Sequence, residues 1–129
     1  MLLNSRRHPY LICADIEKAF LMVGINEADR DCLRFLWLKD PACAPTRDNV
    51  EIFRFRRVPF GVVCSPYLLQ AAIEKLLKES DFPIASELKH AKYMDNLYYG
   101  SSSVEEALKK YKEIKKLFVK VGMNIREFL

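Results

Sequence analysis

The stretch that most constrains the fold is residues 92–100, KYMDNLYYG, where apolar and aromatic residues lie on both sides of an Asp–Asn pair. This pattern predicts two short strands joined by a tight turn, with Asp95 and Asn96 at its tip. Both residue types are common in turns because they tolerate the unusual backbone angles there. Taken alone, the stretch indicates ordinary turn chemistry, and any further role depends on the rest of the chain.

The chain has 129 residues, half of them hydrophobic and 29% charged, which predicts one domain with one core. No apolar run approaches the roughly 18 residues that a membrane span requires, and the first nine residues contain no signal-peptide core. We therefore expect no membrane partner and an intracellular place, in cytoplasm or nucleus. The net charge of +4 permits a polyanionic partner without requiring one.

The cysteines do not predict a metal centre. They form no C-x-x-C pair, and the chain has only two histidines. Zinc sites need a closer set of such ligands, so a zinc site is disfavoured. We expect reduced and mostly buried thiols at Cys13, Cys32, Cys43 and Cys64.

Hydrophobic patterns predict the order of elements along the chain. Residues 9–14 form an apolar, strand-like run that ends at Asp15, and short helical segments are expected at 16–22 and 27–31. A strand is expected at 33–38. Residues 50–58 alternate between a basic and an aromatic face, which is the period of a strand.

Two longer helices follow. Ser65 is the predicted N-cap and Pro66 the first residue of a helix that ends near 79, before a strand leads into the Asp95 hairpin. The last helix can begin with a capping box at Ser102 or Ser103 and ends at Gly122. Its lysines are expected to face solvent. Its predicted core stripe consists of Val104, Ala107, Leu108, Tyr111, Ile114, Phe118 and Val121.

This order of strands and helices indicates an α+β fold, an antiparallel sheet with helices packed on one face. Asp15 and Asp95 both end apolar strand-like runs. If the two strands are neighbours, the two carboxylates converge, and two like charges in contact favour a cation between them. Carboxylate oxygens suit Mg²⁺, and a pair of such ions can assist phosphoryl transfer.

Three blocks, in order, resemble the palm of a reverse transcriptase. They are ADIEKAF at 14–20, VPFGVVCSP at 58–66 and YMDN at 93–96. The runs SVEEA at 103–107 and GMNIRE at 122–127 further resemble the Pao (BEL/Pao) class of retrotransposons. The resemblance covers nearly the whole chain and implies a polymerase palm of ferredoxin-like fold over residues 1–129.

The resemblance also implies partners and metal ligands. Asp15 and Asp95 would hold Mg²⁺, with Mn²⁺ as a substitute, and Asn96 would complete the catalytic set. The reaction would be RNA-directed DNA synthesis, adding deoxynucleotides to the 3′-OH of a primer on an RNA or DNA template.

Further positions would contact the substrates. The Ile16 amide would lie near the triphosphate, and Phe20 would pack under the sugar and exclude a 2′-OH. Phe60 and Gly61 would shape the nucleotide pocket. The primer end would lie beside Tyr93 and Met94. The alternative for Phe20 and Phe60 is ordinary core packing.

Two features depart from the family's pattern. Asn96 stands where the family usually has a second Asp, which removes one negative charge from a site that binds Mg²⁺ largely through charge. Some elements of the Pao class are expected to tolerate this change. The N-terminal fingers and the thumb are also expected to lie outside residues 1–129, so that the isolated chain would not polymerise.

Two other functions stay open. A nucleotidyl cyclase also uses paired acids, but the block at 58–66 argues against it. A decayed or domesticated fragment would at most bind nucleic acid without sequence preference, through Arg54, Arg56, Arg57 and the C-terminal lysines.

Overall fold

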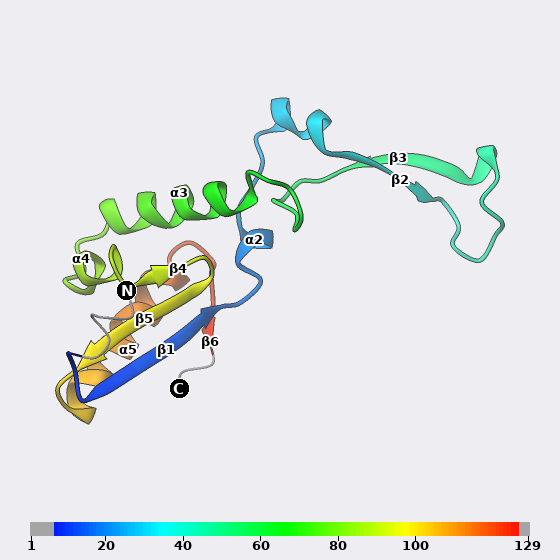
Figure 1. The fold of residues 1–129 in the computed structure, drawn as a ribbon. Coiled ribbons are helices and arrows are strands. Elements are labelled where there is room, and N and C mark those ends of the chain that lie inside the picture. Colours follow the sequence, from blue (N-terminus) through cyan, green and yellow to red (C-terminus); the bar gives the residue numbers. More distant parts are fainter. Residues whose placement is uncertain (1–6, 127–129) are drawn as a thin grey trace.

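A four-stranded antiparallel sheet organises the chain. The structure, a computed structural model, describes residues 7–126. The strand order is β4 (Lys92–Tyr93), β5 (Asn96–Ser101), β1 (Tyr10–Ile16) and β6 (Ile125–Arg126), with every neighbouring pair antiparallel (Figure 1). The first and last described strands therefore lie side by side, and the Asp95 hairpin occupies the opposite edge.

One face of this sheet forms the hydrophobic core. Ala14 and Ile16 of β1 and Leu97 and Tyr99 of β5 are buried, because side chains on one face recur at every second residue. The other face carries the pair Asp15 and Asn96, which are opposite each other in register. The sheet thus separates a packed side from an open side that holds the polar residues.

The helices cover the packed side. They are α3 (Ser65–Lys78), α4 (Ile84–Leu88) and α5 (Val104–Val119), with the single turn α2 (Ala19–Met22) at the end of β1. Residues from α2, α3, α4 and α5 join those of the sheet in one core cluster. The predicted α+β fold, an antiparallel sheet with helices on one face, is confirmed.

The start of α5 follows one of the two predicted caps. Ser103 Oγ accepts a hydrogen bond from the Glu106 N–H at 3.2 Å, and the Glu106 carboxylate accepts one from the Ser102 N–H at 2.8 Å. Hydrogen bonds from Ser102, with Lys110 close by, lower the pKa of Glu106 to about 2. Ser103 is therefore the N-cap, but the reciprocal half of the predicted capping box does not form, because the Glu106 carboxylate bonds the N–H of Ser102, one residue before the cap.

The predicted stripe on α5 is correct only in its middle. Ile114 and Phe118 are buried, and Leu117 joins them. Val104, Leu108 and Val121 are exposed, so their predicted burial was wrong. Six residues at roughly 100° each turn Leu108 about 120° away from Ile114, and Val121 comes after the helix has ended.

A second sheet projects from this body as a hairpin (Figure 1). It consists of β2 (Arg34–Leu38) and β3 (Val50–Arg54), flanked by the 3₁₀ turns η1 (Glu27–Leu33) and η2 (Arg47–Asn49). Phe35 stacks on Phe53 with ring centroids 5.8 Å apart and contacts Phe55 in a tilted arrangement with centroids 4.7 Å apart. The predicted clustering of Phe53 and Phe55 is confirmed, but the strand predicted over 50–58 ends at Arg54, so Phe55 lies just beyond it.

Some expectations were wrong. Helix α4 lies where only a strand was expected, and β6 was not predicted, since two residues are too few to show a period. Cys32, Cys43 and Cys64 are exposed, and only Cys13 is partly buried.

The Pao-like run at 122–127 is described as far as Arg126. Within residues 7–126, no helix is both long and apolar enough to cross a membrane.

Candidate functional site

The turn of the β4–β5 hairpin lies one residue earlier than predicted. Tyr93 pairs with Asn96, so the two loop residues are Met94 and Asp95, and Asn96 is the first residue of β5. Met94 adopts a left-handed conformation with φ 52°. Positive φ at the first loop residue is a feature of tight hairpin turns and costs energy in a residue with a side chain. The expectation that Asp95 and Asn96 form the tip is corrected accordingly.

Backbone bonds fasten this turn to the end of β1. The Ile16 N–H donates to the Asp95 carbonyl at 2.8 Å, and Asn96 Nδ2 donates to Asp95 Oδ1 at 3.1 Å. Asp15 is the register partner of Asn96. The three predicted catalytic residues therefore lie at one end of two neighbouring strands. The Ile16 amide is committed to the hairpin rather than open to a ligand.

On its other side, β1 meets a basic residue that the sequence did not single out. Arg126 of β6 pairs in register with Asp15, and its Nε donates to Asp15 Oδ2 at 3.2 Å. Arg126 Nη1 also lies 3.7 Å from Glu17 Oε1. Asn124 Nδ2 in turn donates to Glu17 Oε2 at 2.8 Å. The carboxylates of Asp15 and Glu17 thus meet the Arg126 guanidinium of β6 at the end of β1, beside the turn that holds Asp95.

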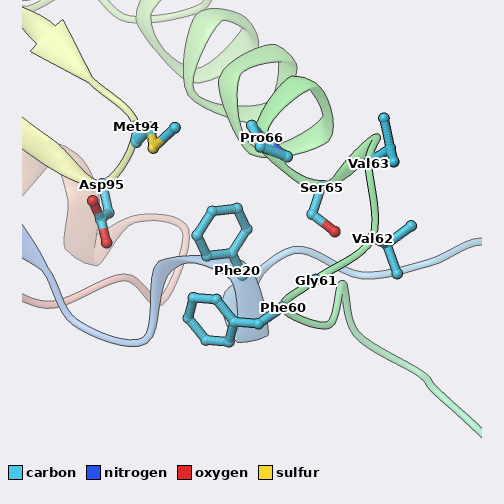
Figure 2. Close-up of a pocket in the computed structure, with 9 residues that line it drawn as sticks. All are labelled: Phe20, Phe60, Gly61, Val62, Val63, Ser65, Pro66, Met94 and Asp95. Atoms are coloured by element: carbon cyan, nitrogen blue, oxygen red, sulfur yellow. The ribbon is translucent and has the colours of Figure 1, made fainter.

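A cavity of about 460 Å³ opens beside the Asp95 turn. Phe20 is 6% exposed and meets Phe60, which is 68% exposed, edge to face with centroids 4.8 Å apart. Figure 2 shows both rings between the Asp95 turn and the loop that precedes α3. The residues that line the cavity are Phe20, Phe60, Gly61, Val62, Val63, Ser65, Pro66, Met94 and Asp95.

A buried hydroxyl shapes the far wall of this cavity. Ser65 Oγ donates to the Pro59 carbonyl at 2.7 Å, which closes the loop that carries Phe60 and Gly61. Gly61 has φ 84°, a conformation that favours glycine. Ser65 is itself the first residue of α3, and Cys64 precedes it as N-cap. The predicted N-cap role of Ser65 was wrong, because its hydroxyl bonds backwards into the loop.

The cavity gathers some of the predicted site residues. Phe20, Phe60, Gly61, Met94 and Asp95 line it and come from all three sequence blocks. Asp15, Ile16, Tyr93 and Asn96 are not among the lining residues. They belong to the strand ends beside it, and Tyr93 is exposed there. The arrangement is an apolar, aromatic hollow with the Asp95 carboxylate at one side.

An ion pair between a buried lysine and a half-exposed glutamate connects the Asp95 hairpin to α3. The side chain of Lys92 is only 2% exposed, and its Nζ lies 3.3 Å from Glu74 Oε1. Gln70 Nε2 also donates to Glu74, at 3.2 Å. These hydrogen bonds, that from Gln70 first and that from Lys92 second, lower the pKa of Glu74. This pair could not be predicted from the sequence, since Lys92 and Glu74 are 18 positions apart.

The donor set suits a hard divalent cation that keeps water or phosphate oxygens in its shell. Asp15 and Asp95 supply carboxylates at the same strand ends, and Mg²⁺ is usually bound by one or two such groups plus substrate phosphates. Within the described part of the chain, no three His, Cys, Asp or Glu side chains gather closely enough to hold a metal alone. The residues therefore fit a cation that arrives with a ligand of its own.

Comparison with known proteins agrees with the three blocks. The chain is 27% identical over 103 residues to the Gag-Pro-Pol polyprotein of bovine leukemia virus (isolate Australian). That match covers 80% of this chain and 7% of the polyprotein. The sequence profile of the family described as reverse transcriptase (RNA-dependent DNA polymerase) matches residues 1–127. Since this match spans nearly the whole sequence, the chain belongs to the reverse transcriptase family.

Proposed function

We propose that this chain is the palm portion of an RNA-directed DNA polymerase from a Pao-type retrotransposon. It would extend a primer on an RNA or DNA template with deoxynucleotides. The single observation that carries the proposal is the meeting of the three blocks: Asp15, Asp95 and the Phe20–Phe60 cavity lie together although they are far apart in sequence. The family membership and the polyprotein relative support it.

Each part of the site has a role in this proposal. Asp15 and Asp95 would hold Mg²⁺ or Mn²⁺, which would supply charge stabilisation for phosphoryl transfer when bound. Asn96 offers Asp95 a hydrogen bond at 3.1 Å and fixes its orientation. Phe20 and Phe60 form the apolar floor for the sugar, and Gly61 leaves room beside it. Tyr93 and Met94 flank the primer end.

Positioning is the main contribution that the chain can make. Phosphoryl transfer depends on alignment and charge stabilisation more than on covalent catalysis by the protein. The Ile16–Asp95 hydrogen bond at 2.8 Å holds the two acidic strand ends at a fixed separation. The cations that neutralise a triphosphate and the surface that holds a duplex are assigned to fingers and thumb segments of a longer polymerase.

Primer extension tests the proposal. The protein is the product of the complete reading frame that contains this chain, supplied with an RNA template, a DNA primer, dNTPs and Mg²⁺ or Mn²⁺. Asp95→Asn should lower the rate by more than about a hundredfold, since even groups behind a metal's ligands matter by roughly 10–100-fold. Asp31→Asn, in the turn η1 beside the projecting hairpin, is the matched control and should leave the rate unchanged.

The outcomes distinguish an active polymerase from a non-catalytic fragment. Extension that requires Asp95 supports the proposal. If the complete protein and its Asn96→Asp form both fail to extend any primer, the polymerase proposal is wrong, and the non-catalytic nucleic-acid-binding fragment replaces it. Asn96→Asp should raise the rate if the missing charge weakens the binding of the cation.

A further inference from the structure

The Asp15 carboxylate, which the proposed function assigns to the metal, is already paired with a positive charge. Arg126 Nε donates to Asp15 Oδ2 at 3.2 Å, and the two residues are register partners on adjacent strands. The Asp15 side chain is 23% exposed and that of Arg126 49% exposed. A divalent cation approaching Asp15 therefore meets a guanidinium bound to the same carboxylate. Like charges at this distance repel, and partial burial limits the screening by water.

A second carboxylate stands ready beside it. Glu17 Oε1 lies 3.7 Å from Arg126 Nη1, so the guanidinium bridges Asp15 and Glu17. Glu17 is held in place from the Asn124 side: its N–H donates to the Asn124 carbonyl at 2.9 Å, and Asn124 Nδ2 donates to its carboxylate at 2.8 Å. A fixed acceptor of this kind can retain the guanidinium when a divalent cation binds Asp15.

We propose that Arg126 is an internal counter-cation of the acidic site, displaced from Asp15 by a divalent cation and retained by Glu17. This inference rests on the proposed function, because it takes Asp15 as a ligand of that cation. It adds a residue that none of the three blocks contains. Arg126 acts through Asp15 and is a positioning residue.

The ion pair has two consequences. Without a cation, Arg126 offsets part of the repulsion between Asp15 and Asp95, so that the strand ends can lie together. With a cation, breaking the contact with Asp15 makes binding weaker than two carboxylates alone would give. Half of the Arg126 side chain is exposed, so this exchange requires no opening of the core. Phosphate oxygens that arrive with the cation add negative charge and favour the exchange.

Mn²⁺ binding to the 129-residue chain tests this directly, without polymerase activity. The free ion is followed by electron paramagnetic resonance in the presence of the unmodified chain, Arg126→Gln and Arg126→Lys. Arg126→Gln should bind Mn²⁺ about tenfold more tightly, the scale on which one neighbouring charge alters a partly exposed carboxylate. Arg126→Lys keeps the charge and should stay near the unmodified affinity.

Control variants assign the effect to the site. Arg34→Gln removes an exposed arginine that pairs with Asp31 in the projecting hairpin, 2.9 Å away, and should leave Mn²⁺ affinity unchanged. Asp15→Asn combined with Arg126→Gln should abolish the gain. Circular dichroism verifies the fold of each variant. Arg126→Met, which keeps an apolar stem, replaces Arg126→Gln if that variant does not fold.

The outcomes distinguish this inference from the proposed function. If Mn²⁺ binds and depends on Asp15, but Arg126→Gln binds no more tightly than the unmodified chain, the counter-cation role is wrong and the metal site stands. If Mn²⁺ binds to none of the folded forms, or binds without regard to Asp15, both the metal site and the counter-cation role are overturned.

Discussion

Phe20 combines two roles that the sequence presented as alternatives. It is 6% exposed and belongs to the core cluster, yet one edge of its ring lines the cavity beside Asp95. A residue fixed by packing on several sides is a more rigid wall than an exposed one. Core packing and a part in the nucleotide pocket are therefore compatible for Phe20, whereas Phe60 is mostly exposed.

Shortening Phe20 tests its role as a barrier to ribonucleotides. In the complete polymerase, Phe20→Val should raise rNTP incorporation relative to dNTP by roughly 10–100-fold, the range that a single apolar group commands in a pocket. The same change should reduce the free energy of unfolding by about 2–4 kcal/mol, because it leaves a cavity in the core. Incorporation ratios and urea unfolding measure the two effects.

Phe60→Ala is the matched control on the same aromatic pair. It removes an edge-to-face contact with Phe20 but little buried surface, so its stability cost should be about 1 kcal/mol or less. A loss of stability in Phe20→Val with an unchanged rNTP to dNTP ratio would make Phe20 a core residue alone.

Among the elements, the β4–β5 hairpin depends on contacts from its neighbours. β4 has only two residues, too short to hold the turn by itself. The Ile16–Asp95 bond fixes one side, and the Lys92–Glu74 pair fixes the other. The position of Asp95 is therefore set jointly by β1 and α3.

The Lys92–Glu74 pair predicts an asymmetry between its two partners. Glu74→Ala leaves a lysine that is 2% exposed without its carboxylate, so it should lower the urea midpoint clearly. Lys92→Met leaves Glu74 partly in water and fills the same volume, so its stability should lie within about 1 kcal/mol of the unmodified chain.

Glu79→Ala, at an exposed pair with Lys75, is the control and should have almost no effect. Equal losses from Glu74→Ala and Lys92→Met would show that the ion pair is not what fixes the hairpin.

Elements with a clear period were predictable, and contacts between distant residues were not. Alternation predicted β3, a run of aromatic and aliphatic residues predicted β2, and helical spacing predicted α3 and α5. The turn at Met94–Asp95 was predicted one residue too late. Asn is a common turn residue and Met is not, so the turn statistics favoured Asp95–Asn96.

The three blocks predicted one shared site for Asp15, Phe20, Phe60 and Asp95, and the structure places these residues near one another. The role of Arg126, by contrast, could not be predicted from the sequence. Its significance comes from its place opposite Asp15 on β6, and a two-residue strand has no period from which that place can be inferred. Sequence patterns therefore located the acids but not the base that pairs with one of them.

At the scale of the whole molecule, the projecting hairpin is separate from the core. None of the core residues falls between Phe20 and Val58. Leu36, Trp37 and Ile52 are exposed by 60–66%, although they are large and apolar. The hairpin is joined to the body chiefly by the short segments that flank it (Figure 1). The chain thus consists of one packed body and one peripheral arm.

Removing the arm should leave the body folded. Leu33 and Phe55 are hydrogen-bonded at 3.1 Å, so replacing residues 34–54 by Asn-Gly closes the same gap with a two-residue turn. Because no core residue is lost and the loop becomes shorter, the free energy of unfolding should change by about 1 kcal/mol or less. The slope of the unfolding free energy against urea concentration should stay within about 15% of that of the unmodified chain, since little buried surface is removed. Urea unfolding followed by circular dichroism measures both.

In the unmodified chain, the amides of β2 and β3 should also exchange with deuterium faster than those of β1 and β5. A shortened chain that unfolds without cooperativity would show that the arm belongs to the folding unit.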